Sequence, residues 1–177
     1  MEFLLEKHPD QSMALKKMSR KKKRIFRKIN PDILYSNIDI EKFINIIMLS
    51  GKKTIARNIV YKAFNYIGKN FNKNPIKIFS IALDNAAPMI ESKIKKSSGV
   101  KRNYFIDIKK YRRKSLSMRW IKKYSKLRKE KFMYLKLAHE IIDASKKKGE
   151  SVKKRESVHK LYNSKKNYNS DKNKRFK

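Results

Sequence analysis

Apolar residues in the first half of the chain recur every three or four positions, the spacing that places them on one face of an α-helix. Three such stripes follow one another: Ile40, Phe43, Ile44, Ile47 and Met48; then Ile55, Ile59, Ala63, Phe64 and Ile67; then Ile76, Phe79, Leu83 and Ala86. Asp39 and Asn74 are suitable N-caps, and Gly51 and Gly68 are suitable helix ends. We therefore predict three helices between residues 39 and 88.

The period changes after Pro88. From residue 89 to 96 and again from 102 to 110, apolar and polar residues alternate around Ser97-Ser98-Gly99. Alternation about a turn sequence is typical of a β-hairpin. Two strands are only marginally stable alone, so we expect the hairpin base to rest on the helices and its tip to project. Tyr104 and Phe105 must lie on opposite faces of the hairpin, and packing and nucleic-acid contact are both open to them.

Helical spacing returns after the hairpin. The three further stripes are Leu116, Trp120, Tyr124 and Leu127; then Phe132, Leu135, Ala138, Ile141 and Ile142; then Val152, Val158, Leu161 and Tyr162. Ser151 can cap the last helix, and no stripe continues beyond Asn163. We assign Trp120 to the core because it shares a stripe with Leu116 and Tyr124. The predicted fold is mainly α, a bundle of about six helices with one protruding β-hairpin between the third and fourth.

The sequence also predicts how the chain is divided. A basic N-terminal extension covers residues 1–30, and one helical domain covers 31–168, with the hairpin at about 89–110. A polar basic tail covers 169–177. The run around residues 16–28 contains no acid, so we expect it to be an extended arm until phosphates neutralise it.

The charge of the chain indicates its kind of partner. Its 49 Lys and Arg against 15 Asp and Glu give a formal net charge of +34 on 177 residues. Such self-repulsion opposes compaction, so we expect the protein to work bound to a polyanion. The basic residues run from Lys16 to Lys177 and do not form one cluster beside a membrane, which favours nucleic acid.

Catalytic and metal chemistry have little support in the sequence. The chain has no cysteine, which excludes disulfides and every zinc site that needs Cys. Glu140 and Asp143 lie one helical turn apart among lysines, a pattern typical of solvated ion pairs. The position of His139 between core residues predicts a packing role. The position of His159 in a basic helix predicts contact with phosphate or with the surface. We expect no enzyme, no metal and no cofactor.

We also expect no membrane partner, because no apolar stretch approaches the roughly 20 residues of a membrane span.

The candidate nucleic-acid contacts are basic residues without interleaved acids. Those outside the hairpin are Arg20, Lys21, Lys22, Lys23, Arg24, Arg27, Lys52, Lys53, Arg57, Arg112, Arg113, Lys114, Arg119, Lys153, Lys154 and Arg155, together with His159. Those on the hairpin are Lys95, Lys96, Lys101, Arg102 and Tyr104.

Several short sequences occur in an order that resembles the small-subunit ribosomal protein seven family of bacterial and organellar type. They are Asn30-Pro31-Asp32 with Tyr35, Lys42-Phe43-Ile44-Asn45, Gly51-Lys52-Lys53, Asn74-Pro75, Arg112-Arg113 with Met118, Arg119 and Trp120, and Val152-Lys153-Lys154-Arg155-Glu156 with Val158-His159. The resemblance covers about residues 19–168.

The resemblance implies a structural constituent of the small ribosomal subunit. Such a protein binds the rRNA directly, early in assembly, and organises the 3′ major domain, which forms the head. Its implied partners are the small-subunit rRNA, neighbouring head and platform proteins, the E-site tRNA and the mRNA near its exit. On this account the hairpin residues face the tRNA and mRNA, and the other candidate residues bind rRNA.

The alternative is a DNA-binding or DNA-compacting basic helical protein, which would share the charge and the helical content. No single helix stands apart as a base-reading helix, which argues against it.

The chain has only 4 Gly and 4 Pro but many Lys, Asn, Ile, Tyr and Phe residues, as A+T-biased coding produces. This composition is typical of an organelle or of a reduced genome. We favour the ribosome of an organelle, a mitochondrion first, over that of a bacterial-type cytoplasm.

Overall fold

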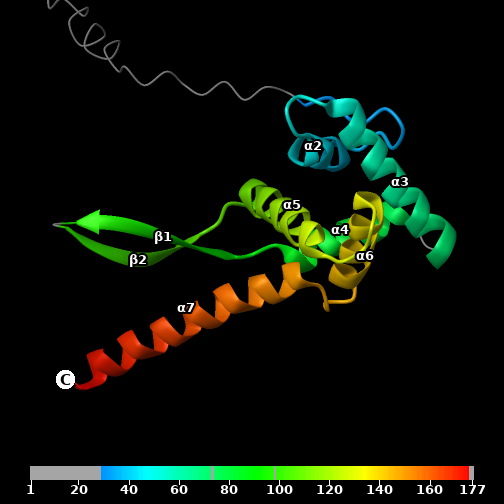
Figure 1. Ribbon diagram of the computed structural model, residues 1–177. Helices are drawn as coiled ribbons and strands as arrows, with labels where there is room; N and C mark the ends of the chain where they lie inside the picture. The colour runs from blue at the N-terminus through cyan, green and yellow to red at the C-terminus, as the bar shows by residue number, and fades with distance from the viewer. Residues whose placement is uncertain (1–28, 73, 98, 176–177) are drawn as a thin grey trace, which may run out of the picture. The chain divides into compact units, whose positions relative to one another are not determined.

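Six helices and one β-hairpin make up the part of the chain that the computed structural model describes, residues 29–72, 74–97 and 99–175. The helices are α2 (Ile38–Ile47), α3 (Lys53–Phe71), α4 (Pro75–Ala86), α5 (Lys110–Leu127), α6 (Met133–Ser145) and α7 (Glu150–Arg175). Strands β1 (Ile90–Ser97) and β2 (Val100–Asp107) form the hairpin between α4 and α5 (Figure 1). The predicted fold class is therefore confirmed, and all these elements belong to one unit that begins at Pro31.

Helix ends follow local hydrogen bonds that the apolar stripes do not reveal. The side chain of Asn37, not Asp39, caps α2 by accepting a hydrogen bond of 2.8 Å from the backbone N–H of Asp39. Gly68 does not end α3, which continues to Phe71. The predicted cap at Asn74 is confirmed, since its side-chain oxygen accepts from the backbone N–H of Ile76 at 3.0 Å.

The core is built around α6 and a group of phenylalanines. Phe79 of α4 packs against Phe43 of α2 and Phe64 of α3, with ring centroids 4.9 and 5.4 Å apart. α6 contacts α3, α4, α5 and α7, and its Leu137 and Ile141 are fully buried. Burial of such side chains supplies most of the driving force for folding. The described helices are thus held by a shared apolar centre.

The buried face of α5 differs from the predicted stripe by one residue. Leu127 is 70% exposed, and Trp120 is only half-buried. The residues that α5 buries are instead Ser117, Met118, Ile121 and Ser125. The two serine hydroxyls donate to the carbonyls three residues earlier, at 2.9 and 3.0 Å, so these small polar residues are satisfied within the core. The assignment of Trp120 to the core was therefore wrong.

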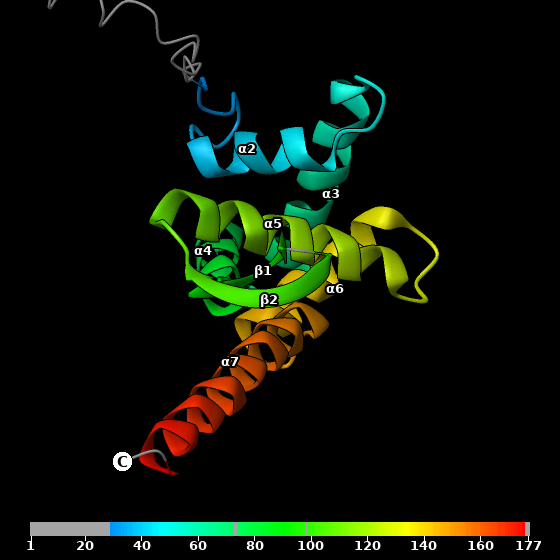
Figure 2. The same ribbon diagram turned by 90° about the vertical axis from the view of Figure 1, so that its left-hand side faces the viewer.

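The hairpin has two unlike faces. In its antiparallel register Ser92 lies opposite Phe105 and Lys93 lies opposite Tyr104. Phe105 packs edge-on against Tyr162 of α7, with ring centroids 5.4 Å apart, whereas Tyr104 on the other face is 41% exposed. Figure 1 shows the hairpin and α7 leaving the same side of the helices, and Figure 2, which faces that side, shows α7 below the hairpin. The hairpin base therefore rests on α7, as expected of two strands that are not stable alone.

Helix α7 runs to Arg175, so it continues past Asn163 into the segment predicted as a polar tail. Its first residue is Glu150, which places Ser151 inside the helix and not at the predicted cap. None of the helices in the described residues has the length and apolar character needed to cross a membrane.

The buried face of α5 is tested by a pair of substitutions on that helix. Ile121→Ala should lower the free energy of unfolding by about 2–5 kcal/mol, because Ile121 is fully buried and its truncation leaves a cavity. Leu127→Ala should change it by no more than about 0.5 kcal/mol, because that side chain is mostly in water. Urea unfolding followed by circular dichroism measures both. Equal losses for the two variants would show that the face is misassigned.

Candidate nucleic-acid interface

One buried carboxylate joins the three helices of the C-terminal half. Glu140 of α6 is fully buried. One of its oxygens accepts hydrogen bonds from the backbone N–H and the hydroxyl of Ser151 in α7, at 3.1 and 2.9 Å. The other accepts from the guanidinium of Arg128, directly after α5, at 2.9 Å. A carboxylate at the N-terminus of α7 is also favoured by the helix dipole.

Close packing beside this carboxylate favours glycine. A side chain at Gly149 would place its Cβ 3.0 Å from the Oε1 atom of Glu140 and 3.0 Å from the backbone nitrogen of Ala144. The turn between α6 and α7 is therefore tight, and it holds Ser151 against Glu140. We call Arg128, Glu140 and Ser151 the helix junction.

Further charges surround the helix junction. Arg128 also pairs with Glu130 at 3.0 Å and with Asp143 at 2.8 Å. Partial burial opposes the charged form of Arg128, but its hydrogen bonds to Glu130, Asp143 and Glu140 outweigh burial and raise its pKa above the ordinary value. The interpretation of Glu140 and Asp143 as solvated ion pairs was therefore wrong for Glu140, whose partners are internal.

His139 extends the same network toward α3. Its Nδ1 atom lies 2.9 Å from a carboxylate oxygen of Glu130, and its Nε2 atom lies 3.3 Å from the hydroxyl of Tyr66. Partial burial alone would raise the pKa of Glu130, but hydrogen bonds from His139, the backbone and Arg128 outweigh it and lower that pKa to about 2. The histidine thus has a structural environment, in line with the packing role predicted for it.

The candidate cations fall into two groups by their carboxylate partners. Five form ion pairs, and the pairs are Lys53 with Glu41, Arg112 with Glu91, Lys114 with Asp39, Lys153 with Glu150, and Arg155 with Glu156. Within the described residues no carboxylate lies within ion-pair distance of Lys52, Arg57, Arg113, Arg119 or Lys154. The second group therefore offers charge that no carboxylate of the described part neutralises.

The base of the hairpin brings candidate residues from α5 and α7 together. The guanidinium of Arg113 donates to the carbonyl of Pro88 at 3.2 Å, and Nε2 of His159 accepts from the backbone N–H of Met89 at 3.1 Å. Burial first, and then the charges of Arg155 and Arg113, lower the pKa of His159. This backbone hydrogen bond to His159 could not be predicted from the sequence, because Met89 lies 70 residues away along the chain.

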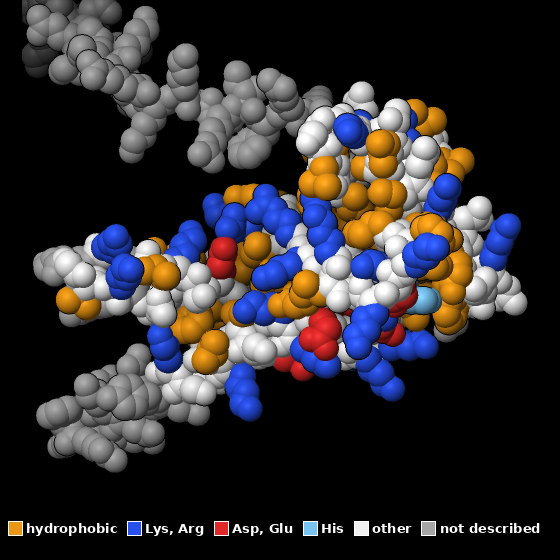
Figure 3. All heavy atoms as spheres, viewed as in Figure 1, with side chains coloured by type: hydrophobic (Ala, Val, Ile, Leu, Met, Phe, Trp, Pro, Cys, Tyr) orange, Lys and Arg blue, Asp and Glu red, His pale blue; other side chains and the backbone are white. Residues whose placement is uncertain are grey.

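Glu91 at the start of β1 completes this cluster. Arg112 donates two hydrogen bonds to its carboxylate, at 2.8 and 2.7 Å, and these bonds lower the pKa of Glu91, assisted by the charges of Lys93 and Arg119. Two parallel bonds fix the plane of the guanidinium. Figure 3 shows Lys and Arg side chains spread over this view of the molecule with few carboxylates among them.

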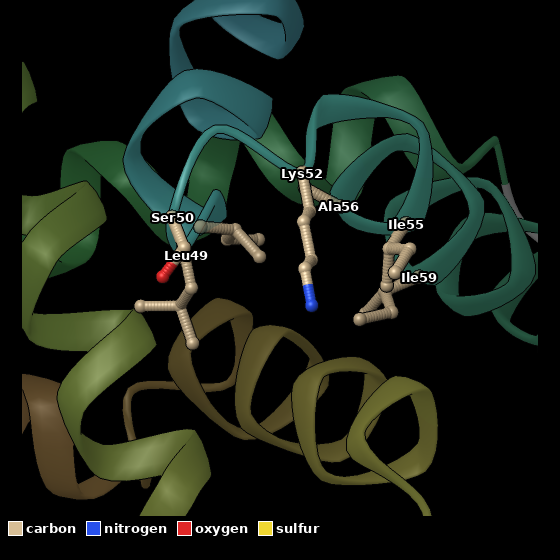
Figure 4. Close-up of a pocket in the computed structure, with 7 residues that line it drawn as sticks. Leu49, Ser50, Lys52, Ile55, Ala56 and Ile59 are labelled. Atoms are coloured by element: carbon tan, nitrogen blue, oxygen red, sulfur yellow. The ribbon is translucent and has the colours of Figure 1, made fainter.

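Other candidate residues lie at the joint between α2 and α3. Lys52 extends between Leu49 and Ile55 beside a cavity of about 260 Å³ (Figure 4). Ile55 was predicted to be in the core but is 54% exposed, because α3 turns Ala56 and Val60 inward instead. Beside this joint, Lys122 of α5 is half-buried and donates to the carbonyl of Ile46.

The remaining candidates lie on the hairpin or outside the described residues. Lys96, Lys101 and Tyr104 are exposed on the hairpin. The side chains of Lys95 and Arg102 are outside the described part, as is the whole N-terminal set of Arg20, Lys21, Lys22, Lys23, Arg24 and Arg27. In the described residues no group of three or more His, Asp or Glu side chains is arranged to hold a metal ion.

These features define a class of protein: a strongly cationic helical body with a basic hairpin, suited to bind a polyanion along several elements. Comparison with known proteins gives the family. The profile of the family described as ribosomal protein S7p/S5e matches residues 19–166.

Individual relatives agree with the profile, and each is named "Small ribosomal subunit protein uS7". The protein of Mycoplasma mobile is 44% identical over 135 residues, which cover 76% of this chain and 86% of the relative. That of Polynucleobacter necessarius is 40% identical over 132 residues, covering 75% and 85%. The chain belongs to the ribosomal protein S7 (uS7) family. It is a protein of the small ribosomal subunit and not an enzyme.

The relatives also bear on the predicted compartment. The named ones are bacterial, and they support a ribosome without supporting a mitochondrion. The resemblance found in the sequence is thus confirmed as to family, while the organelle assignment has no support from these relatives.

The lowered pKa of Glu130 gives a pH-dependent contribution to stability. Its folded pKa of about 2 lies below the ordinary 4.5, so Glu130 stabilises the fold fully above pH 4.5 and loses this effect as the pH falls toward 2. Glu130→Gln should therefore destabilise the protein at neutral pH, and its difference from the parent should shrink toward zero between about pH 4.5 and 2. Thermal unfolding of both proteins across this range measures the difference, and a difference that is constant with pH would contradict the assignment.

Proposed function

We propose that this protein binds small-subunit rRNA directly and early in assembly, and that it organises the 3′ major domain, the head. Its position there would be near the E-site tRNA and the mRNA exit, beside neighbouring head and platform proteins. The proposal rests on membership of the uS7 family and on one structural observation: cations that pair with no carboxylate of the described residues lie on α3, α5 and α7, which share a single core.

The mechanism follows from repulsion between RNA strands. Phosphates of several rRNA helices repel one another wherever they converge, and lysine and arginine side chains reduce that repulsion. The cations that no carboxylate of the described part pairs with lie at three places that can each contact a different strand. These are Lys52 and Arg57 at the start of α3, Arg113 and Arg119 of α5, and Lys154 of α7. Because the helices are packed together, the angles between those strands become fixed.

Folded RNA needs no base-reading helix for such recognition. Its deep major groove is closed to side chains, and proteins recognise it largely through shape, phosphates and 2′-hydroxyls. Positioned charges with additional Asn and Tyr contacts therefore suffice. The paired cations contribute differently, since Glu91 fixes the guanidinium plane of Arg112 and so aims its remaining donors.

The hairpin is proposed to face the tRNA and the mRNA. Lys96, Lys101 and Tyr104 are exposed on it, and its base is held by α7 through Phe105 and by α5 through Arg112. A projecting tip of this kind can reach a ligand that arrives after the rRNA has folded around the helices. Its contacts would then affect the finished subunit more than its assembly.

The strength of phosphate binding is tested by salt. Affinity for a transcript of the 3′ major domain of bacterial small-subunit rRNA should fall by about a thousandfold or more between about 50 and 200 mM salt, taking duplex behaviour as a guide. Filter binding at a series of salt concentrations measures this slope. A response of less than about tenfold over the same range would contradict the electrostatic mechanism.

The DNA-binding alternative is tested by competition. Duplex DNA with the same number of phosphates as the rRNA transcript should compete poorly, because it lacks the arrangement of strands that the fixed cations require. Equal competition by the two nucleic acids would mean that charge alone is recognised, as in a DNA-compacting protein.

A shortened hairpin separates the tip from the rRNA-binding body. Ile94 and Asn103 lie directly opposite each other, so replacing residues 95–102 by Asn-Gly leaves a two-residue turn of suitable geometry. The melting temperature and the affinity for rRNA should change little, while E-site tRNA retention by reconstituted subunits should be altered.

The matched control for this variant keeps the length and removes charge. Lys96→Gln with Lys101→Gln should weaken tRNA contact less than the shortened hairpin if reach matters, and equally if charge alone matters. If the shortened protein is folded and subunits still fail to assemble, the hairpin belongs to the primary rRNA site and the proposed division of the surface is wrong.

A further inference from the structure

A small cavity lies where the hairpin base, α5 and α7 meet. Its volume is about 150 Å³, and its lining comes from all three elements: Ile90 and Glu91 of β1, Leu116 and Trp120 of α5, and Lys154 and Val158 of α7. Pockets that enclose drug-sized ligands measure about 300–1,000 Å³. This cavity is too small for such a ligand, but it can accept one planar ring system.

Trp120 is the distinctive wall of this cavity. It is the only tryptophan of the chain, and it is half-buried because α5 turns Met118 and Ile121 into the core instead. In the described part of the chain the indole N–H donates no hydrogen bond to another protein group. Tryptophan at such a position usually combines an apolar contact with a polar partner. At Trp120 both the apolar ring and the indole N–H are available to a ligand.

The charges around the cavity are those that attract a nucleotide. Lys154 belongs to the wall and has no carboxylate within ion-pair distance in the described residues. Glu91, the acidic member of the wall, is held by the two hydrogen bonds from Arg112 and lies within the influence of Lys93 and Arg119. The charges around the cavity therefore sum to a positive value. This favours a nucleotide, which carries a negative phosphate, over an aromatic side chain of a neighbouring protein.

We propose that this cavity receives one unpaired nucleobase of the bound RNA, which stacks on the indole of Trp120 while its phosphate contacts Lys154. Sequence-tolerant stacking of a splayed-out base on an aromatic side chain is a common way for proteins to hold single-stranded positions in RNA. The inference rests on the proposed rRNA binding and adds to it a site for an unpaired nucleotide at the hairpin base. It gives the half-buried Trp120 a role that the core does not.

The first test uses the single tryptophan as its own reporter. The full chain is titrated with the 3′ major domain transcript while anisotropy of labelled RNA reports binding and Trp120 fluorescence is read in parallel. Stacking should quench the indole emission in step with the anisotropy. Binding without any change in Trp120 emission would overturn this inference and leave rRNA binding intact, whereas absence of binding would overturn both.

The second test compares variants on α5. Trp120→Leu should weaken binding by about fivefold to a hundredfold, the range for loss of one aromatic–base stack, and should leave the salt slope unchanged because no charge is lost. Trp120→Phe should recover most of the affinity. Tyr124→Leu, one turn along the same helix and outside the cavity wall, should bind as the parent does.

The third variant addresses the phosphate, and circular dichroism addresses folding. Lys154→Gln should lower the salt slope by about one. Melting temperatures identify any variant that fails to fold, and the fluorescence titration of the parent decides the inference even if Trp120→Leu is unstable. Affinity unchanged in a folded Trp120→Leu protein would overturn the proposal and leave an aromatic side chain of a neighbouring protein as the occupant to test.

Discussion

The arrangement of the C-terminal half depends on the fully buried carboxylate of Glu140. It joins Arg128 at the end of α5 to Ser151 at the start of α7, and so it sets how these two helices leave α6. Removing one partner of a buried ion pair commonly costs about 3–5 kcal/mol, because the other charge is left without compensation. The relative orientation of α5 and α7 sets the positions of the cations on both helices. It also sets how Tyr162 supports the hairpin and where the cavity wall with Trp120 lies.

A second constraint is the shortage of acids in a chain with 49 basic residues and 15 acidic ones. Several of the acids in the described part are used to fix elements relative to one another. Asp39 of α2 pairs with Lys114 of α5, Glu41 of α2 pairs with Lys53 of α3, and Glu91 of β1 pairs with Arg112 of α5. Glu41 is buried, whereas Asp39 and Glu91 are partly exposed. Pairs that are open to solvent add little to stability, but they orient the cations that they hold. The proposed rRNA contacts are the cations that pair with no carboxylate of the described residues.

The sequence was sufficient for the order of helices, for the hairpin and for the family, since helical period, alternation and short motifs are local properties. It was insufficient where small polar residues replace apolar ones. Ser117 and Ser125 satisfy their hydroxyls within α5 and become core, which turns Leu127 and half of Trp120 outward. The role of Glu140 was missed for a related reason, because its partners Arg128 and Ser151 are distant in the sequence and only the fold brings them together.

On the proposed mechanism, rRNA recognition depends on a rigid arrangement of cations and not on net charge alone. The decisive measurement is the rRNA affinity of Glu140→Gln beside that of Glu150→Gln, under conditions where both are folded. Each change removes one acid, but Glu140 is buried in the helix junction while the side chain of Glu150 is 57% exposed. If the mechanism holds, Glu140→Gln binds rRNA more weakly than the parent despite its added positive charge, and Glu150→Gln does not. Equal or tighter binding by Glu140→Gln would contradict it.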